Sequence, residues 1–478
     1  MKATPSHTRA QREPVPRIQP LKQSSRANYI NDLPIPVEQS SSTLLQKAKQ
    51  KAKDKDASLI LPYACTQFAL TIPVLLIPII AGDLAGTSGN TAQIVGSIVS
   101  LSTLGAGIGK VVNGFVCQSL GGRKSGMLYL LGLSAFSFML ATTNSLHGYA
   151  IAGMEFCASM MWTAMTVLFS EKYDSDAAKF SSGIMTLSLA STTGTLVAKF
   201  LGGALLSQFH WRQVCLLSAF VAALGSSILF LNRDANSNII NDGANSRKIS
   251  VEIEKTNPPS ISSIFASIKN VVGRKMFLAI AFAKFTLFIV RQCDKILGTY
   301  IIDVTDLPKY LAGSLTSSVT LGFVFGLVSG GKVHDLESAK EKKSFIGKRY
   351  ALGVSSCLGL AFCATKMAGA MFSPLGLAAA ITVTSGLLAA SIGFQFYQLV
   401  PMYAPTFGKD KAVFISFCDA FGFLMLSPFW SSVGKIVDTF DNGWTLTWLG
   451  IAGFLAAGGS IMTRNLEKIM RLEDKKEN

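Results

Sequence analysis

Long, uncharged apolar runs constrain the fold of this chain more than any other feature. Residues 59–81 and 214–231 contain no charged side chain. Runs of about 20 apolar residues match the thickness of a bilayer core. Only 15% of all residues are charged, whereas roughly 25% is usual for a soluble domain. We therefore expect an all-α membrane protein that crosses the bilayer many times, and not a soluble enzyme.

About twelve such runs can be traced, with boundaries good to a few residues. They lie near 59–82, 93–118, 125–143, 147–170, 181–207, 213–231, 276–301, 311–333, 350–368, 374–400, 411–437 and 444–463. The long polar segment 232–275 separates them into two sets of equal size. The predicted fold is thus two bundles of six transmembrane helices.

The polar segments complete the predicted domain organisation. We expect a disordered basic tail at 1–57, the first bundle at 58–231, a linker at 232–275, the second bundle at 276–463 and a tail at 464–478. In the linker, "ISSIFASIKNVV" has apolar residues at helical spacing, which predicts a helix lying in the membrane interface. The Arg-rich, acid-poor start of the chain also permits an organellar transit peptide, although its prolines argue against an amphipathic helix.

The net charge of +16 is explained by membrane topology. Basic residues gather in the loops on one side of the predicted spans, including Arg123, Lys124 and residues 340–349. The loops on the other side hold little beyond Arg212 and Lys309. The positive-inside rule then places both termini in the cytoplasm, with the spans in the plasma membrane or an organelle membrane. Lipid is the expected partner, and no nucleic acid.

The two halves of the chain repeat each other at an offset of 217 residues. "GAGIGKVVNG" at 105–114 aligns with "GFVFGLVSGG" at 322–331, and "QFALTI" at 67–72 aligns with "KFTLFI" at 284–289. Two parallel repeats predict pseudo-symmetry about an axis along the membrane normal. The repeat pairs Gly105 with Gly322, Gly109 with Gly326 and Gly114 with Gly331. Glycines at four-residue spacing predict close helix packing.

Four ionisable residues interrupt the predicted span 276–301: Lys284, Arg291, Asp294 and Lys295. A charge at mid-bilayer costs about 2.5–3.5 kcal/mol, so they need compensation or a function. The three cations share one face of a straight helix, and Asp294 can pair with Arg291 one turn away. This pattern favours a positively charged cavity for an anion, since a guanidinium grips phosphate or carboxylate through two hydrogen bonds. The structural alternative is an ion pair that locks helices together, with Glu155 or Asp419 as the partner.

Three further charges lie alone in predicted spans. Lys110 follows Gly109 in a glycine-rich run, so we expect it to face the cavity rather than lipid. Glu155 and Asp419 are isolated acids, which we interpret as counter-charges for the cations or as proton carriers in a coupled cycle. The sequence alone does not choose between these two roles.

This architecture resembles the major facilitator superfamily, whose signature loop reads G-x-x-x-D-R-x-G-R-R. The corresponding stretch here is "GFVCQSLGGRKSG". Gly114, Gly121, Arg123 and Lys124 fit the signature, Gln118 stands where the acid is expected, and the repeat places Asp335 at the acid position of the second half. The resemblance implies that this loop controls conformational change.

A closer resemblance is to the organophosphate:phosphate antiporter branch of that superfamily. It is carried by "GAGIGKVVNGFV", "FTLFIVRQCDKILGTYIID" and "VGKIVDTFDNGW". In that branch a lysine and an arginine in these segments help to bind phosphate, which implies such roles for Lys110 and Arg291. The branch has a second arginine in its first span, where this chain has Val74 and no basic residue from 59 to 81.

We therefore expect a secondary active transporter that moves a small organic anion by alternating access, with a phosphorylated metabolite moved by exchange as the favoured case. Lys110, Arg291, Lys295 and Lys284 are its candidate substrate-binding residues. The alternatives are a proton-coupled carrier of a neutral or carboxylated solute, and a transporter-like receptor or scaffold. No Gly-rich nucleotide loop and no catalytic constellation is visible, and the eight cysteines lack metal-ligand spacing. We expect a monomer that is not an enzyme and has no cofactor or metal.

Overall fold

The computed structural model describes residues 38–85, 90–143, 145–172, 177–231, 268–330, 333, 336, 338–403, 407 and 411–477. By its contacts the chain divides into Met1–Ala52 and Lys53–Asn478. In the first unit the described residues, 38–52, are helical. The second unit contains all the predicted spans. Asp335 and most of the 232–275 linker, including the start of its predicted interfacial helix, lie outside the described residues.

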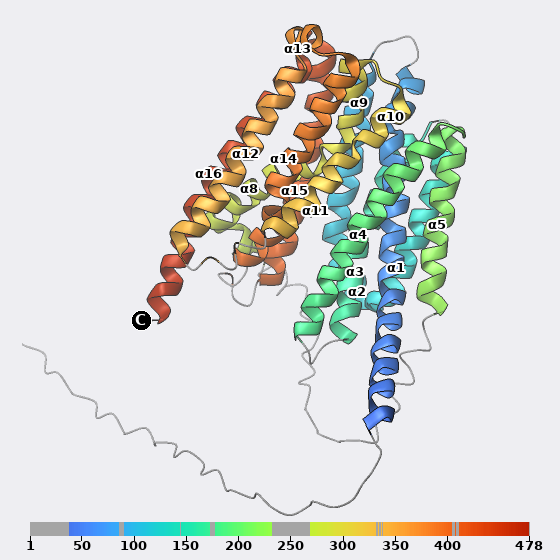
Figure 1. Ribbon diagram of the computed structural model, residues 1–478, viewed down its shortest axis with the longest axis vertical. Helices are drawn as coiled ribbons and strands as arrows, with labels where there is room; N and C mark the ends of the chain where they lie inside the picture. The colour runs from blue at the N-terminus through green and yellow to red at the C-terminus, as the bar shows by residue number, and fades with distance from the viewer. Residues whose placement is uncertain are drawn as a thin grey trace, which may run out of the picture. The chain divides into compact units, whose positions relative to one another are not determined.

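The described chain is built from helices that fall into two groups (Figure 1). The first group consists of α1 (Glu38–Ala85), α2 (Thr91–Thr142), α3 (His147–Lys172), α4 (Ala177–Leu206) and α5 (Trp211–Leu231). The second consists of α8 (Lys275–Gln292), α9 (Asp294–Thr305), α10 (Lys309–Leu315), α11 (Ser317–Gly330), α12 (Ala339–Cys363), α13 (Lys366–Met371), α14 (Pro374–Tyr403), α15 (Lys411–Thr439) and α16 (Gly443–Glu477). We call these groups the first half and the second half.

The helices agree with the predicted membrane spans. Among the described residues, nine helical segments are long and apolar enough to cross a membrane, and the bent pair α8–α9 makes a tenth. The helices α3 and α12, of 26 and 25 residues, stand where the two remaining spans were predicted. The all-α membrane fold in two six-helix bundles is thus confirmed.

The ninth span is displaced from its predicted position of 350–368. The helix α12 begins at Ala339, because the Ser338 side chain caps it by accepting a hydrogen bond from the Glu341 amide. It ends at Cys363, and the rest of the predicted span belongs to the short helix α13.

Two terminal segments predicted as tails are helical. The helix α1 begins at Glu38, within the segment 1–57 that the sequence predicted to be disordered. The helix α16 continues to Glu477, through the predicted tail 464–478. The first extension is rich in Lys, Gln, Ala and Leu and the second in Lys, Glu, Arg and Leu, all residues with high intrinsic helix propensity.

Two turns interrupt the spans that matter for the site. Gly121, with a φ of 76°, lies between the two spans of α2, and its left-handed backbone explains a glycine in the predicted control loop. The seventh span, predicted to be one helix, bends by 50° at Cys293 into α8 and α9. No Gly or Pro marks this bend, so the sequence pattern did not reveal it.

The internal repeat is visible in helix packing. A methyl group on Gly105 or Gly109 would collide with the backbone of α3 at Ala152 or Phe156. In the second half, a methyl group on Gly322 or Gly326 would collide with the backbone of α14, at Gly386 or Ala390. The contacted residues are four apart in each half, so the repeated glycines make equivalent contacts, as the sequence predicted.

A second repeated contact ties the last span of each half to the first. The Trp211 indole donates to Asp83 at 3.0 Å, and the Trp444 indole donates to Asp303 at 3.0 Å. These four residues lie at one end of the bundles, which the positive-inside rule places on the non-cytoplasmic side of the membrane. We call this end the outer end.

The two halves meet closely at the outer end, where α2 packs against α15. The Gln93 backbone N–H donates to the Asp438 carboxylate at 2.6 Å, and the hydroxyls of Ser100 and Ser427 are 2.9 Å apart. A methyl group on Gly96 would lie 2.9 Å from the Gly434 Cα. This contact joins the halves without room for side chains between the two glycines.

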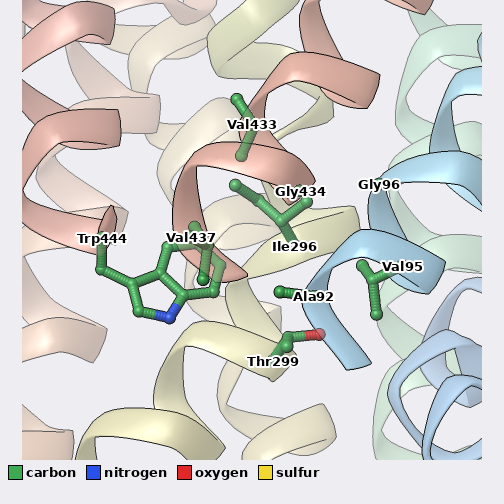
Figure 2. Close-up of a pocket in the computed structure, with 9 residues that line it drawn as sticks. All are labelled: Ala92, Val95, Gly96, Ile296, Thr299, Val433, Gly434, Val437 and Trp444. Carbon is green, nitrogen blue, oxygen red and sulfur yellow. The ribbon is translucent and has the colours of Figure 1, made fainter. Parts of the chain in front are cut away.

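A small, mainly apolar pocket lies in the same contact (Figure 2). It is lined by Ala92, Val95, Gly96, Ile296, Thr299, Val433, Gly434, Val437 and Trp444. No charged side chain lines it, so it is a packing gap in the outer contact rather than a site for an ionic substrate.

Candidate functional site

Eight charged side chains from six helices meet between the two halves. They are Lys110 on α2, Glu155 on α3, Lys199 on α4, Lys284 and Arg291 on α8, Asp294 and Lys295 on α9, and Asp419 on α15. Seven of the eight were singled out by the sequence, and Lys199 was not.

The first ion pair joins the halves through Lys199 and Asp294. The Lys199 ammonium lies 3.2 Å from the Asp294 carboxylate, and the lysine side chain is 0% exposed. It also donates to the Thr316 carbonyl at 3.1 Å, at the break between α10 and α11. Because both groups are buried and hydrogen-bonded, this pair holds α4 of the first half against α9 of the second.

A second buried ion pair joins the halves through Lys295, the residue that follows Asp294. Lys295 forms an ion pair and hydrogen bond with Glu155, and it donates to the Ser102 hydroxyl at 3.0 Å. Glu155 and Ser102 belong to the first half, and Lys295 to the second. The bend at Cys293 lets neighbouring residues of α9 reach two different helices of the other half.

Arg291 is held more loosely than the buried lysines. Its guanidinium lies 3.8 Å from Asp294, beyond hydrogen-bond distance, and its side chain is 27% exposed. It lies 5.1 Å from the Phe323 ring, Tyr397 is close enough to form a hydrogen bond with it, and Glu155 is close enough to interact with it electrostatically. Arg291 therefore borders open space while its charge is only partly balanced.

Lys284 and Asp419 form a loose pair within the second half. Their charged atoms are 3.7 Å apart, and the Asp419 side chain is 28% exposed. The Lys284 ammonium donates to the Phe396 carbonyl and lies 4.1 Å from the Phe396 ring and 5.0 Å from that of Phe288. The lysine is thus enclosed, whereas the carboxylate reaches open space.

Lys110 approaches this pair from the first half. It is half-buried and lies close enough to Lys284 to interact with it electrostatically. Its neighbour Gly109 packs on α3, as described above. Among the residues that the structure describes, no ion pair to Lys110 is found.

The eight side chains carry more positive than negative charge. Five are cations and three are carboxylates, and all lie within apolar helices. Charges removed from water and left without a partner are costly, so this excess favours an anion between the halves.

The structure pairs the predicted charges differently from the sequence expectation. Arg291 pairs with Asp294, as predicted, but the acids proposed as its alternative partners, Glu155 and Asp419, pair with Lys295 and Lys284. Both lysines are only 4% exposed, so neither extends to the membrane surface. The reason is the bend at Cys293, which separates Lys295 from the face that it would share with Lys284 on a straight helix.

Lys199 is the charged residue that sequence reasoning missed. It stands alone in the apolar run "TLVAKFLGG", which is the same signal that identified Lys110. It also provides a first-half cation beside Asp294, although the first span has none. Val74, where the resembling branch has an arginine, lines a small pocket beside Asp294 and Lys295.

The predicted control loop is only partly described. Arg123 is half-buried and Lys124 is exposed beside the turn at Gly121. The surroundings of Gly114 and of the Gln118 side chain are not described, and Asp335 lies outside the described residues, so the predicted role of this loop stays a prediction.

Helices in two repeated halves, with paired charges buried between them, define a membrane transporter. The sequence model of the Major Facilitator Superfamily matches residues 59–392, more than half of the chain. The chain belongs to the major facilitator superfamily.

Solved transporter structures show the same fold at low sequence identity. A POT family transporter in complex with 5-aminolevulinic acid aligns with a TM-score of 0.62 at 12% identity, over 87% of this chain and 96% of that one. The nucleoside transporter NupG aligns with a TM-score of 0.59 at 13% identity, over 87% of this chain and 99% of that one. A D-xylose–proton symporter aligns with a TM-score of 0.56 at 12% identity, over 84% of this chain and 96% of that one. No curated protein sequence matches the chain significantly.

Proposed function

We propose that this transporter moves a small organic anion across a membrane by alternating access. The observation that supports the proposal is Arg291, which lies between the halves within a span, is 27% exposed and has only a loose ion pair. An arginine in this position has donors available for a ligand, and its planar fork suits carboxylate and phosphate oxygens.

The four predicted substrate-binding cations divide into two roles. Arg291 and Lys110 are accessible and incompletely paired, so they contact the anion directly. Lys284 and Lys295 are buried in ion pairs, so they add positive potential without touching the substrate. The phosphate roles implied for Lys110 and Arg291 by the antiporter branch agree with this division, and exchange of a phosphorylated metabolite is the specific form that we favour.

The contacts between the halves support alternating access. The outer end is closed by α2 against α15, and two buried ion pairs join the halves beneath it. Opening this end requires the halves to separate there and both pairs to break. An anion at Arg291 competes with Asp294 for the guanidinium, so substrate binding changes the charge balance beside the Lys199–Asp294 pair.

Uptake by proteoliposomes containing the purified protein tests the proposal. The screen uses labelled phosphate, sugar phosphates and dicarboxylates, with wild type and Arg291→Lys at matched protein levels. Loss of one charge-assisted hydrogen bond, worth about 1.5–3 kcal/mol, lowers uptake about ten- to hundredfold while the pair with Asp294 survives. The matched control is Arg464→Lys, which changes an exposed arginine at the end of the last span.

Two results would contradict the proposal. If the lysine variant takes up the substrate as fast as wild type while Arg291→Ala fails to fold, Arg291 is only a structural lock. If no anion in the screen is taken up by wild type, the anion substrate is wrong and the receptor or scaffold alternative gains support.

A proton-coupled carrier of a neutral or carboxylated solute is the second candidate. It is favoured by Asp419, a carboxylate that is 28% exposed within an apolar helix. Uptake that needs an inward pH gradient and is abolished by Asp419→Asn would support this candidate. Uptake that needs only a trans anion would support exchange.

A further inference from the structure

The charges between the halves form two clusters along α8 and α9. The outer cluster contains Lys199, Arg291 and Lys295 with Asp294 and Glu155, and the inner cluster contains Lys110 and Lys284 with Asp419. Each cluster therefore has one cation more than it has carboxylates. The excess of positive charge is therefore divided between the two clusters.

Each cluster has one cation that its own acids do not satisfy. In the outer cluster it is Arg291, 3.8 Å from the nearest carboxylate, while the two lysines are hydrogen-bonded in buried pairs. In the inner cluster it is Lys110, for which the described residues provide no ion pair, while Lys284 has Asp419 at 3.7 Å and the Phe396 carbonyl. These two cations come from opposite halves.

The clusters are separated by about two turns of helix. Lys284 precedes Arg291 by seven residues, which corresponds to about 10 Å along the axis. Aromatic rings fill the interval on the side of the second half. Arg291 lies 5.1 Å from the Phe323 ring, this ring lies 6.1 Å from that of Phe396, and the Phe396 ring lies 4.1 Å from Lys284. An apolar wall thus connects two positive centres.

We propose that the substrate is a dianion whose two anionic groups stand at opposite ends of an apolar body. One group binds Arg291, the other binds Lys110, and the body lies along the half-buried Phe396. This inference rests on the proposed function and specifies its substrate class. A single anionic group neutralises only one cluster, whereas an elongated dianion neutralises both and bridges the halves.

Three eight-carbon compounds of different end charge test the proposal: octanoate, suberate and 8-aminooctanoate. Their affinities are measured by calorimetry on the purified full-length protein in nanodiscs. Suberate is expected to bind about tenfold or more tightly than octanoate, because it makes a second charge-assisted contact. 8-Aminooctanoate is expected to bind more weakly than octanoate, because its ammonium meets the excess cation of the inner cluster.

Two substitutions move the suberate-to-octanoate affinity ratio in opposite directions. Lys110→Gln makes the inner cluster neutral, so the ratio falls to about one to threefold. Asp419→Asn adds to the positive excess there, so the ratio rises above that of wild type. A merely structural role of these residues would not produce opposite shifts. Lys435→Gln, at an exposed lysine of α15, is the control and leaves the ratio unchanged.

If Asp419→Asn does not fold, the double variant Lys284→Met with Asp419→Asn replaces it in the affinity measurement. This variant removes both members of the pair, so neither is left buried without a partner. Lys110 is then alone in the inner cluster, and suberate keeps its advantage over octanoate.

Several outcomes would overturn the inference. They are equal affinity of suberate and octanoate for wild type, a preference for 8-aminooctanoate, tighter binding of octyl phosphate than of suberate, or a ratio that Lys110→Gln leaves unchanged. In these cases the proposed anion transport stands as long as Arg291→Lys impairs uptake. Binding of none of these compounds, with no anion taken up, overturns both.

Discussion

The two halves of the molecule share their scaffold and differ in their charges. Each half packs a glycine pair onto a neighbouring helix and ties a tryptophan to an aspartate at the outer end. The first span of the first half, in contrast, has no charge from 59 to 81, whereas the corresponding span of the second half has four between Lys284 and Lys295. Packing is duplicated, whereas the charges are not: the first half contributes three of the eight charged side chains and the second half five.

This difference follows from what each feature requires. Close contact between helices needs the same small residues wherever it occurs, so the repeat preserves them. A buried charge is tolerated only where it meets a partner or a ligand, so the repeat can diverge at the charges. The bend at Cys293 contributes to this divergence, since it directs neighbouring residues of α9 toward α3 and α4 of the other half.

The largest expected effect is the loss of uptake when a disulfide crosslinks the two halves. In a cysteine-free background, Ser100→Cys with Ser427→Cys places two thiols where hydroxyls now lie 2.9 Å apart across the halves. Oxidation should abolish uptake by proteoliposomes, and a reductant should restore it, because the outer end can no longer open.

The matched control is Ser318→Cys with Ser385→Cys, whose hydroxyls are also 2.9 Å apart but belong to the second half alone. Its oxidation should leave uptake near the wild-type rate. Equal loss of uptake in both pairs would mean that the halves do not move as separate bodies.

The next largest effect is a loss of stability when the buried Lys199–Asp294 ion pair is broken. Lys199→Met removes the partner of Asp294 and should destabilise the protein by about 3 kcal/mol, as expected when one member of a buried ion pair is lost. A lower midpoint of thermal unfolding in detergent would show this. The double substitution Lys199→Met with Asp294→Asn should recover part of the loss. Unchanged stability of the single variant would disprove the role of this pair.

The glycine contacts should respond alike in the two halves. Gly105→Ala and Gly322→Ala each force a methyl group against a backbone carbonyl, which should cost about 1–3 kcal/mol. Thermal unfolding is again the measurement, with Gly453→Ala as the control, since no atom lies within 4 Å of its added methyl group. Destabilisation in only one half would show that the repeat is not equivalent in packing.

The smallest effect concerns the outer tryptophans. Trp211→Phe and Trp444→Phe each remove one hydrogen bond of 3.0 Å to a carboxylate and keep most of the apolar surface. Each should lower stability by about 1 kcal/mol, and the two losses should add in the double variant because the sites are separate. A loss in the double variant that clearly exceeds the sum would indicate coupling between the sites.

The fold was largely predictable from sequence because its signals are local. Apolar runs located the spans, and the glycine repeat located the contacts of α2 and α11. The charged residues were also identifiable, since each stands out against apolar neighbours, as Lys199 does. Their pairing was not, because it depends on the bend at Cys293, where no Gly or Pro is present, and on the spatial approach of α3, α4 and α15.

The adjacent residues Asp294 and Lys295 have a consequence for how the halves dock. They present a negative and then a positive charge, and the first half presents Lys199 and Glu155 in the complementary order. Because the two residues are neighbours on one short helix, a movement of α9 away from the first half strains both ion pairs at once. Breaking only one of them would leave buried charges without partners, which is costly. We therefore expect the two pairs to form and break together, so that closure of the outer end is cooperative.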